Sequence, residues 1–172
     1  EKDLDKLMKR TAGRPLPSGK ISVPQAIIWC VILGVASLAI FVSVFNLTTG
    51  LISLLSLVLY GFVYTPLKRV GPIAVFVGAF PGAFPPMIGW VAATNQFGLE
   101  PGILFAIQFF WQFPHFWAIA WVLDDDYKRA GFKLLPAKGL KDTDTALQIM
   151  IYTIFLLPIG WLPYELGMTG IN

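Results

Sequence analysis

The chain has 172 residues, of which 56% are hydrophobic and 13% are charged. Soluble domains have about 45–50% apolar and about 25% charged residues, so this composition indicates a membrane protein. The single Cys excludes a disulfide framework and the single His excludes a multi-histidine metal centre. The net charge is only +3, and we expect no nucleic-acid partner. Because the chain begins at Glu1 and not at Met, we expect it to be an internal piece of a longer protein.

Charged residues are absent from four stretches of the chain, 21–67, 70–99, 101–123 and 145–164. A membrane-spanning helix needs about 20 apolar residues, so the first stretch is long enough for two helices. Its polar segment 46–50 predicts the break between them. The apolar residues do not alternate with a period of two, which argues against a β-barrel. The predicted fold class is an all-α polytopic membrane protein with five spans, at about 24–45, 50–66, 72–94, 102–123 and 146–163.

All basic residues lie on one side of these five spans. The stretches 1–23, 67–71 and 124–145 hold six, two and five Lys or Arg residues, which is all 13 of them. The positive-inside rule places this side in the cytoplasm of a bacterium, or in the matrix of a mitochondrion. We therefore expect an integral protein of the bacterial cytoplasmic (inner) membrane or of the mitochondrial inner membrane. Eight of the ten acidic residues lie on the same side, which indicates a site for a metal and a polyanion.

The first charged cluster covers residues 1–20. If its start is helical, Glu1 and Asp5 are one turn apart on one face. Two such carboxylates can share Mg²⁺, a hard cation whose oxygen ligands often include substrate phosphates. Arg10 and Arg14 follow with the same spacing, and guanidinium groups pair well with phosphate. The alternative is a solvated run of charges that binds anionic lipid.

The second charged cluster covers residues 124–138 and follows the fourth span directly. Its three consecutive carboxylates repel one another, which favours a bound cation or partial protonation and makes Asp125 and Asp126 candidate metal ligands. Lys128 lies beside them as a candidate anion-binding group. The alternative is the solvated C-terminus of a helix, although acidic residues at that end oppose the helix dipole.

Three further positions could contribute to the same face of the membrane. Lys68 and Arg69 end the second span and could bind an anion, or could only anchor the helix by the positive-inside rule. Tyr64 could be an interfacial aromatic residue or a polar group that faces a cavity. Sequence leaves these alternatives open.

The fourth span contains His115 directly after Pro114. Ionisable groups inside membranes are costly and therefore suggest a function. On an uninterrupted helix His115 and Asp126 would share a face, because they are 11 residues apart. The alternative is a structural His that is hydrogen-bonded to a neighbouring helix.

The third span is rich in helix-breaking residues, and we expect a bent or interrupted helix. Its small residues allow close helix contact or a bulky ligand. The breakers are Pro72, Pro81, Pro85, Pro86, Gly78, Gly82 and Gly89.

Together these features predict a helical bundle with a charged mouth and an aromatic interior. Such a site suits a substrate with a diphosphate head and a hydrocarbon tail. A metal ion would make the diphosphate a better leaving group, and the apolar cavity would protect an allylic cation from water.

Several motifs resemble those of the UbiA-type intramembrane prenyltransferases, and most closely the branch that farnesylates protoheme IX. They are EKDLD followed by RTAGRPLPSGKI, then YTPLKR, VGAFPGAFPPMIGW, WQFPHFWAIAW and DDDYKRAGFKLLP, in the family's order. The resemblance implies a nine-helix bundle around a central cavity, of which this chain holds about five helices and lacks the N- and C-terminal ones. It also implies Mg²⁺-dependent transfer of farnesyl from farnesyl diphosphate to a vinyl group of heme B, which makes heme O for heme-copper oxidases. Heme B would be a substrate and not a permanent cofactor, and heme A synthase or oxidase assembly factors would be partners.

The resemblance also implies roles for individual residues. Acidic residues would bind the metal or act in catalysis, and basic ones would contact diphosphate or a heme propionate. His115 falls where the family has an intramembrane His, so it is a candidate for heme contact or proton handling. By position, the implied catalytic residues are Asp5, Asp126 and His115, the implied metal ligands include Glu1, Asp5 and Asp126, and the implied anion-binding residues are Arg10, Arg14, Lys68 and Lys128.

Other classes of protein fit the sequence less well. A related prenyltransferase that acts on an aromatic acid or a quinone precursor could use the same charged clusters. A transporter would hold its ionisable groups nearer the membrane midplane and would show internal repeats. A non-catalytic assembly subunit would leave the adjacent acidic and basic residues at 124–129 unexplained.

Overall fold

The structure is a computed structural model that describes residues 1–136 and 139–170. Within these residues every regular element is a helix and none is a strand. Five helical segments are long and apolar enough to cross a membrane: Val23–Phe45, Leu47–Leu67, Ile73–Thr94, Leu99–Val122 and Thr143–Glu165. The all-helical class and the five candidate spans are therefore confirmed. Residues 137 and 138, which end the second charged cluster, lie outside the described residues.

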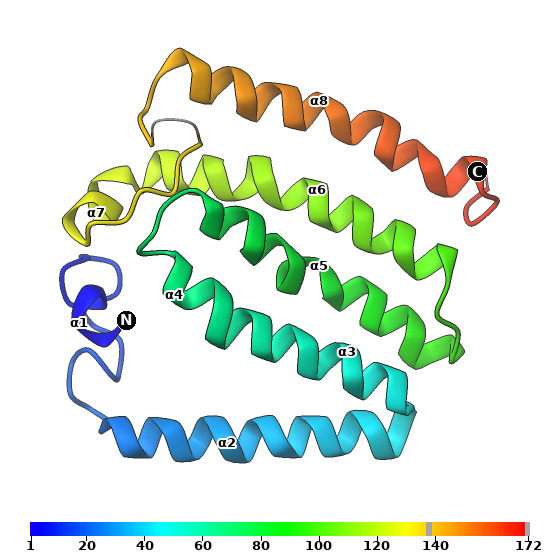
Figure 1. The fold of residues 1–172 in the computed structure, drawn as a ribbon, viewed down its shortest axis with the longest axis horizontal. Coiled ribbons are helices and arrows are strands. Elements are labelled where there is room, and N and C mark those ends of the chain that lie inside the picture. The colour runs from blue at the N-terminus through cyan, green and yellow to red at the C-terminus, as the bar shows by residue number, and fades with distance from the viewer. Residues whose placement is uncertain (137–138, 171–172) are drawn as a thin grey trace.

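Figure 1 shows the order of the helices along the chain. Two of the spans are composite, because α2 continues into the π-helix η1, and α3 continues through the π-helix η2 into α4. The elements are α1 (Lys2–Asp5), α2 (Val23–Ile40), η1 (Phe41–Phe45), α3 (Leu47–Val58), η2 (Leu59–Tyr64), α4 (Thr65–Leu67), α5 (Ile73–Thr94), α6 (Leu99–Val122), α7 (Asp124–Arg129) and α8 (Thr143–Glu165).

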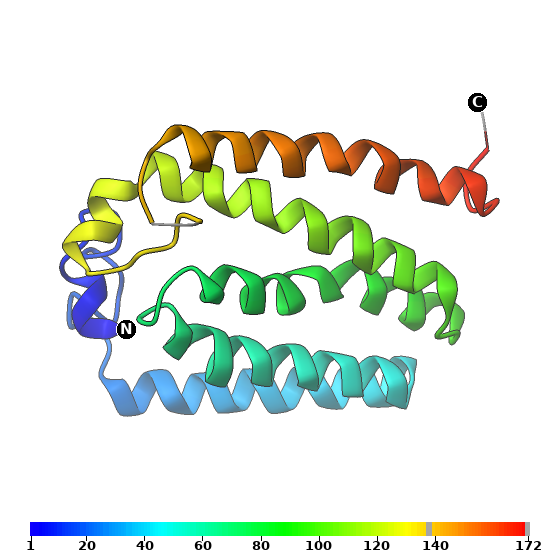
Figure 2. The same cartoon turned by 45° about the horizontal axis from the view of Figure 1, so that its top comes forward.

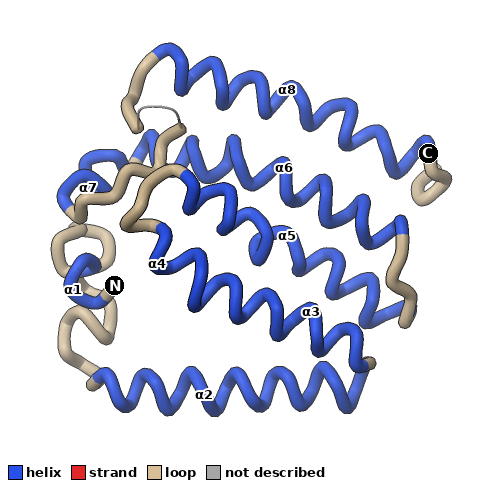
Figure 3. The backbone as a smooth tube through the Cα atoms, viewed as in Figure 1, coloured by secondary structure: helices blue, strands red, loops and turns tan. Residues whose placement is uncertain are grey.

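The long helices run back and forth, so that successive connections alternate between the two ends of the bundle (Figures 1 and 2). Helix α6 packs between α5 and α8, and α5 packs against α3 and η2. The longer loops gather at the end that also holds the short helices α1 and α7 (Figure 3). The stretches 1–22, 68–72, 123–136 and 139–142 thus meet at one end of the molecule. This end carries most of the charged residues.

Polar residues mark the starts of three spans. Ser22 and Gln25 form a capping box before α2, and Asp142 caps α8 by accepting from the backbone N–H of Thr145 at 2.8 Å. Asn46 caps α3 through Thr49 and also donates its side-chain amide to the carbonyl of Val91 at 2.9 Å. The polar segment between the first two spans is therefore a helix start that is fastened to α5.

Aromatic rings fill the contact between α5 and α6. The rings of Phe80 and Phe109 lie 4.9 Å apart in an edge-to-face arrangement, and Phe84 lies 5.3 Å from Phe105. Ala79 and Ala83 on α5 are completely buried, so the two helices approach closely there. By contrast, α2 has no buried residue.

The sequence predicts a bent or interrupted helix for this span; α5 is one continuous helix in spite of its internal prolines, so it is not interrupted. Proline has no N–H, so Pro85 leaves the carbonyl of Pro81 without its usual partner in the helix. The hydroxyl of Ser56 donates to that carbonyl at 3.4 Å. A neighbouring helix therefore supplies a hydrogen bond that proline removes, which keeps backbone polar groups satisfied in apolar surroundings.

Candidate active site at the charged end of the bundle

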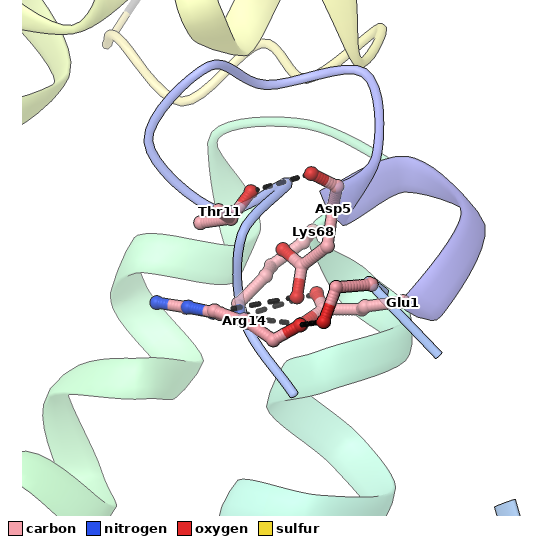
Figure 4. Close-up of polar contacts among 6 residues, drawn as sticks. Glu1, Asp5, Thr11, Arg14 and Lys68 are labelled. Atoms are coloured by element: carbon pink, nitrogen blue, oxygen red, sulfur yellow. Dashed lines mark hydrogen bonds and ion pairs between the residues drawn. The ribbon is translucent and has the colours of Figure 1, made fainter. Parts of the chain in front are cut away.

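Glu1 and Asp5 lie one turn apart across α1, where the N–H of Asp5 donates to the carbonyl of Glu1 at 2.8 Å. Each carboxylate contacts a base: Glu1 lies 3.1 Å from Nζ of Lys68, and Asp5 lies 3.3 Å from Nη1 of Arg14 (Figure 4). The hydroxyl of Thr11 donates to the backbone carbonyl of Asp5 at 2.7 Å. The predicted pairing of these two acids on one face is thus present, and both already have cationic partners.

Lys68 connects α1 to the membrane-spanning helices. Its ammonium group lies 4.6 Å from the centre of the Tyr64 ring, which is a cation–π distance. Tyr64 is buried against α5 at Gly78, where an added Cβ would lie 2.6 Å from the ring. A glycine at position 78 therefore leaves room for the Tyr64 ring in its place beside Lys68.

A cavity of about 340 Å³ lies between α1 and the long helices. Such a volume falls in the range of about 300–1,000 Å³ that is typical of small-molecule sites. One part of its wall is charged and the other is apolar and aromatic. The charged and polar lining residues are Glu1, Asp5, Arg10, Thr11 and Arg14 from the N-terminal segment, with Tyr60, Tyr64, Lys68 and Tyr127; the apolar ones are Met8, Val75, Phe116, Ile119, Ala120, Phe132 and Leu134.

The acidic residues of the second charged cluster begin a new helix. The α6 helix ends at Val122, and Asp124, Asp125 and Asp126 form the first turn of α7. Acidic residues at the N-terminus of a helix are favoured by its dipole. The conflict with the dipole that the sequence suggested is therefore absent, and these acids have a structural reason to be there.

The three acids of α7 have different surroundings. Asp124 is buried and lies 2.7 Å from Nζ of Lys128, and this contact raises the pKa of Lys128. Asp126 accepts from the backbone N–H groups of Lys9 and Arg10, at 3.3 Å each. Asp125 is exposed.

The structure thus brings together six of the predicted residues and leaves five outside the cavity. Glu1, Asp5, Arg10, Arg14, Tyr64 and Lys68 line it. Arg69, Lys128 and Asp125 are exposed at the same end of the molecule. Asp126 accepts hydrogen bonds from the backbone of the N-terminal segment. His115 and these four residues do not line the cavity.

His115 lies on the exposed face of α6 and stacks on Trp111, with ring centres 4.2 Å apart. It borders a shallow depression that is formed with Ala118, Ile119, Val122 and Leu123. Because α6 ends at Val122, the helix is not continuous from His115 to Asp126. The prediction that His115 and Asp126 share one helix face is therefore wrong.

The sequence analysis missed several lining residues. Thr11 is almost completely buried and fixes the loop after α1, and Tyr127 and Phe132 also line the cavity. Their positions inside the two charged clusters were a usable signal. Met8 packs against Ala130 and Phe132. This contact holds the N-terminal segment over the bundle.

Metal ligands were predicted from both charged clusters. Among residues 1–136 and 139–170, no three acidic, His or Cys side chains converge as a metal site. The carboxylates that share the cavity wall are those of Glu1 and Asp5. Any ion held by this arrangement needs further oxygen ligands, which a bound phosphate group can provide.

Comparison with known proteins identifies the family. The model of the UbiA prenyltransferase family matches residues 1–171. The protoheme IX farnesyltransferase of Cytophaga hutchinsonii is 62% identical over 172 residues, which is 100% of this chain and 60% of that protein. The protein of the same name from Flavobacterium psychrophilum is 55% identical over 170 residues, which is 99% of this chain and 56% of that protein.

A more distant relative is the mitochondrial protoheme IX farnesyltransferase of Arabidopsis thaliana. It is 41% identical over 166 residues, which is 96% of this chain and 38% of that protein. The chain thus spans less than two thirds of the length of these relatives. No solved structure matches it. Since the family match covers nearly every residue, the chain belongs to the UbiA prenyltransferase family.

Proposed function

We propose that this protein, at its full natural length, transfers the farnesyl group of farnesyl diphosphate to a vinyl group of heme B and so makes heme O. The observation that carries the proposal is the cavity whose lining combines charged groups with apolar, aromatic ones. Relatives named protoheme IX farnesyltransferase that align with nearly all of this chain support heme B as the acceptor.

The charged wall would bind the diphosphate head. Arg10, Arg14 and Lys68 all line the cavity, and guanidinium and ammonium groups pair with phosphate oxygens. Lys68 and Arg14 are held in place by Glu1 and Asp5 before substrate arrives. The site is therefore rich in bases without carrying a large uncompensated charge.

Glu1 and Asp5 would also hold Mg²⁺ together with the diphosphate. Their carboxylates are hard oxygen donors that lie on the same wall, so the residues present fit such an ion. When bound, the ion neutralises charge that develops on the leaving diphosphate. Transfer of Arg14 and Lys68 from the carboxylates to the diphosphate would free both acids for this role.

The apolar wall would hold the farnesyl chain and keep water from its first carbon. Val75, Phe116 and Phe132 line this side of the cavity. During reaction the bond between that carbon and the diphosphate oxygen breaks, and a new carbon–carbon bond forms to the vinyl group. A water molecule then supplies the hydroxyl group and releases a proton, which balances the conversion of heme B to heme O.

His115 does not line the cavity, and we propose that it contacts the acceptor from the neighbouring depression that it borders on α6. Its stack with Trp111 presents a flat aromatic surface on α6, which suits contact with a planar macrocycle.

We also propose that the charged end faces the cytoplasm of a bacterium or the matrix of a mitochondrion, with the protein in the inner membrane. Delivery of heme O to heme A synthase or to oxidase assembly factors belongs to the same proposal.

The proposal is tested with the full-length protein in membranes supplied with heme B, farnesyl diphosphate and Mg²⁺. Extracted hemes are read by mass spectrometry, and Arg14→Ala is compared with wild type. A heme heavier by a farnesyl group plus a hydroxyl group, lost in the variant, is the expected result. Unmodified heme together with prenylation of a hydroxybenzoate would instead assign the protein to the aromatic-acid branch.

A further inference from the structure

Asp126 uses both oxygens of its carboxylate on the backbone of another segment. Oδ1 accepts from the N–H of Lys9 and Oδ2 accepts from the N–H of Arg10, at 3.3 Å each. The guanidinium of Arg129 also contacts Oδ1, which holds the carboxylate in its orientation. The side chain is only 13% exposed. A carboxylate that is occupied in this way is directed at the N-terminal segment and not at the cavity.

The segment that Asp126 holds contains the bases of the proposed diphosphate site. Arg10 provides one of the two N–H groups, and its side chain lines the cavity. Arg14 is connected to this point by backbone turns, since its N–H donates to the carbonyl of Thr11 at 3.0 Å. Thr11 is itself fixed to Met8, whose carbonyl accepts from its N–H at 3.2 Å.

We call the two hydrogen bonds from the N–H groups of Lys9 and Arg10 to Asp126 the clamp. Apolar packing beside the clamp does not by itself fix the rotation of the N-terminal segment. Met8 contacts Ala130 and Phe132, but such contacts are not directional. The two hydrogen bonds to one carboxylate define both the position and the orientation of the backbone at residues 9 and 10. The direction in which the Arg10 side chain leaves the backbone follows from that orientation.

We propose that Asp126 is a positioning residue, which fixes the backbone at Lys9 and Arg10 and thereby sets Arg10 and Arg14 over the diphosphate. The effect on diphosphate binding rests on the proposed function. The two hydrogen bonds of the clamp do not depend on it. This positioning role differs from the role of metal ligand that the family resemblance implies for Asp126. The metal would instead be held by Glu1 and Asp5, which line the cavity.

The clamp is tested without any measurement of activity, by trypsin treatment of the full-length protein in membranes. Cleavage after Lys9 and Arg10 is compared among wild type, Asp126→Asn, Asp126→Ala and the matched control Asp125→Asn. Loss of a charge-assisted hydrogen bond raises the population of a locally open state by about tenfold or more. We expect such an increase for Asp126→Ala, a smaller one for Asp126→Asn, and none for Asp125→Asn.

Cleavage after Arg69, in the loop between α4 and α5, reports on general unfolding in the same samples. Faster cleavage at residues 9 and 10 with unchanged cleavage at Arg69 supports the clamp. Equal cleavage rates at residues 9 and 10 in Asp126→Ala and Asp125→Asn would overturn it.

The consequence for the site is tested by kinetics of Asp126→Asn. A positioning role predicts a KM for farnesyl diphosphate that is raised about tenfold, while the Mg²⁺ concentration for half-maximal rate stays unchanged. A raised Mg²⁺ requirement with an unchanged KM would show that Asp126 is a metal ligand. If wild type transfers no farnesyl group, the proposed function fails, and the trypsin result still decides whether the clamp exists.

Discussion

The side-chain amide of Gln112 on α6 donates a hydrogen bond of 3.1 Å to the backbone carbonyl of Gly82 on α5. This carbonyl is the one that would accept from residue 86 in a regular helix, and residue 86 is proline. Gln112 is buried, so its side-chain amide makes this hydrogen bond away from bulk water. A buried glutamine in a membrane-spanning helix is therefore explained by a proline on the neighbouring helix.

Replacement of Gln112 by Leu should destabilise the contact between α5 and α6. It leaves the Gly82 carbonyl without a partner in apolar surroundings, which costs about 1–3 kcal/mol. The measurement is thermal denaturation in detergent. Gln108→Leu, one turn earlier on α6, is the matched control, since no hydrogen bond of its side chain is found within the described part of the chain. Equal melting temperatures for the two variants would contradict this role of Gln112.

Gly78→Ala should disturb the site through Tyr64. The added methyl group would lie 2.6 Å from the Tyr64 ring, so the ring must leave its place beneath Lys68. Such overpacking costs about 1–3 kcal/mol. We expect a lower melting temperature and a raised KM for farnesyl diphosphate.

The control for Gly78→Ala is Gly89→Ala on the same helix, where an added Cβ meets nothing within 4 Å. Since alanine favours helix more than glycine does, this control should be neutral or slightly stabilising. If both variants behave alike, the close contact between Gly78 and Tyr64 is not important for the site.

Arg14→Ala should weaken substrate binding more than folding. The guanidinium is about half exposed, so its pair with Asp5 contributes little to stability. A hydrogen bond between charged groups in the bound complex is worth about 1.5–3 kcal/mol, which corresponds to about a tenfold to a hundredfold rise in KM. Lys20→Ala, in the same segment but outside the cavity, should change KM less than about twofold. A KM for Arg14→Ala within the range of this control would exclude a direct contact with diphosphate.

The pair of Lys128 and Asp124 predicts a specific pH dependence. The hydrogen bond to Asp124 raises the pKa of Lys128 from its ordinary value of 10.5. A group whose pKa is raised on folding stabilises the folded state below its ordinary pKa, and this contribution is lost as the pH rises through the raised value. Lys128→Gln should therefore lower the melting temperature slightly and equally at about pH 6 and about pH 8. A difference that grows between these two pH values would contradict the pairing.

Local sequence patterns were sufficient for some parts of the site and not for others. The pairing of Glu1 with Asp5 follows from a spacing of four residues, which one helical turn converts into neighbouring side chains. The prediction for His115 and Asp126 used the same periodicity over 11 residues. It is wrong because a break at Leu123 redirects the chain, and nothing in the apolar pattern marks that break.

The roles of the three acids on α7 illustrate the same limit. In the sequence they are equivalent members of one acidic run. In the structure Asp124 is buried and pairs with the exposed Lys128, Asp125 is exposed, and Asp126 accepts hydrogen bonds from the N-terminal segment. Their partners lie up to 117 residues away along the chain, so only packing of distant segments could distinguish them.

The sequence by itself determined the class and the five spans, because apolar length and the placement of charge are summed along the chain and need no tertiary contact. It also determined which end of the bundle is charged. The tertiary structure decided which charged groups face one another: Lys68 meets Glu1, and Arg14 meets Asp5. It also decided that Gln112 compensates Pro86. These relationships depend on how helices that are distant in sequence pack and rotate, which a periodic pattern does not specify.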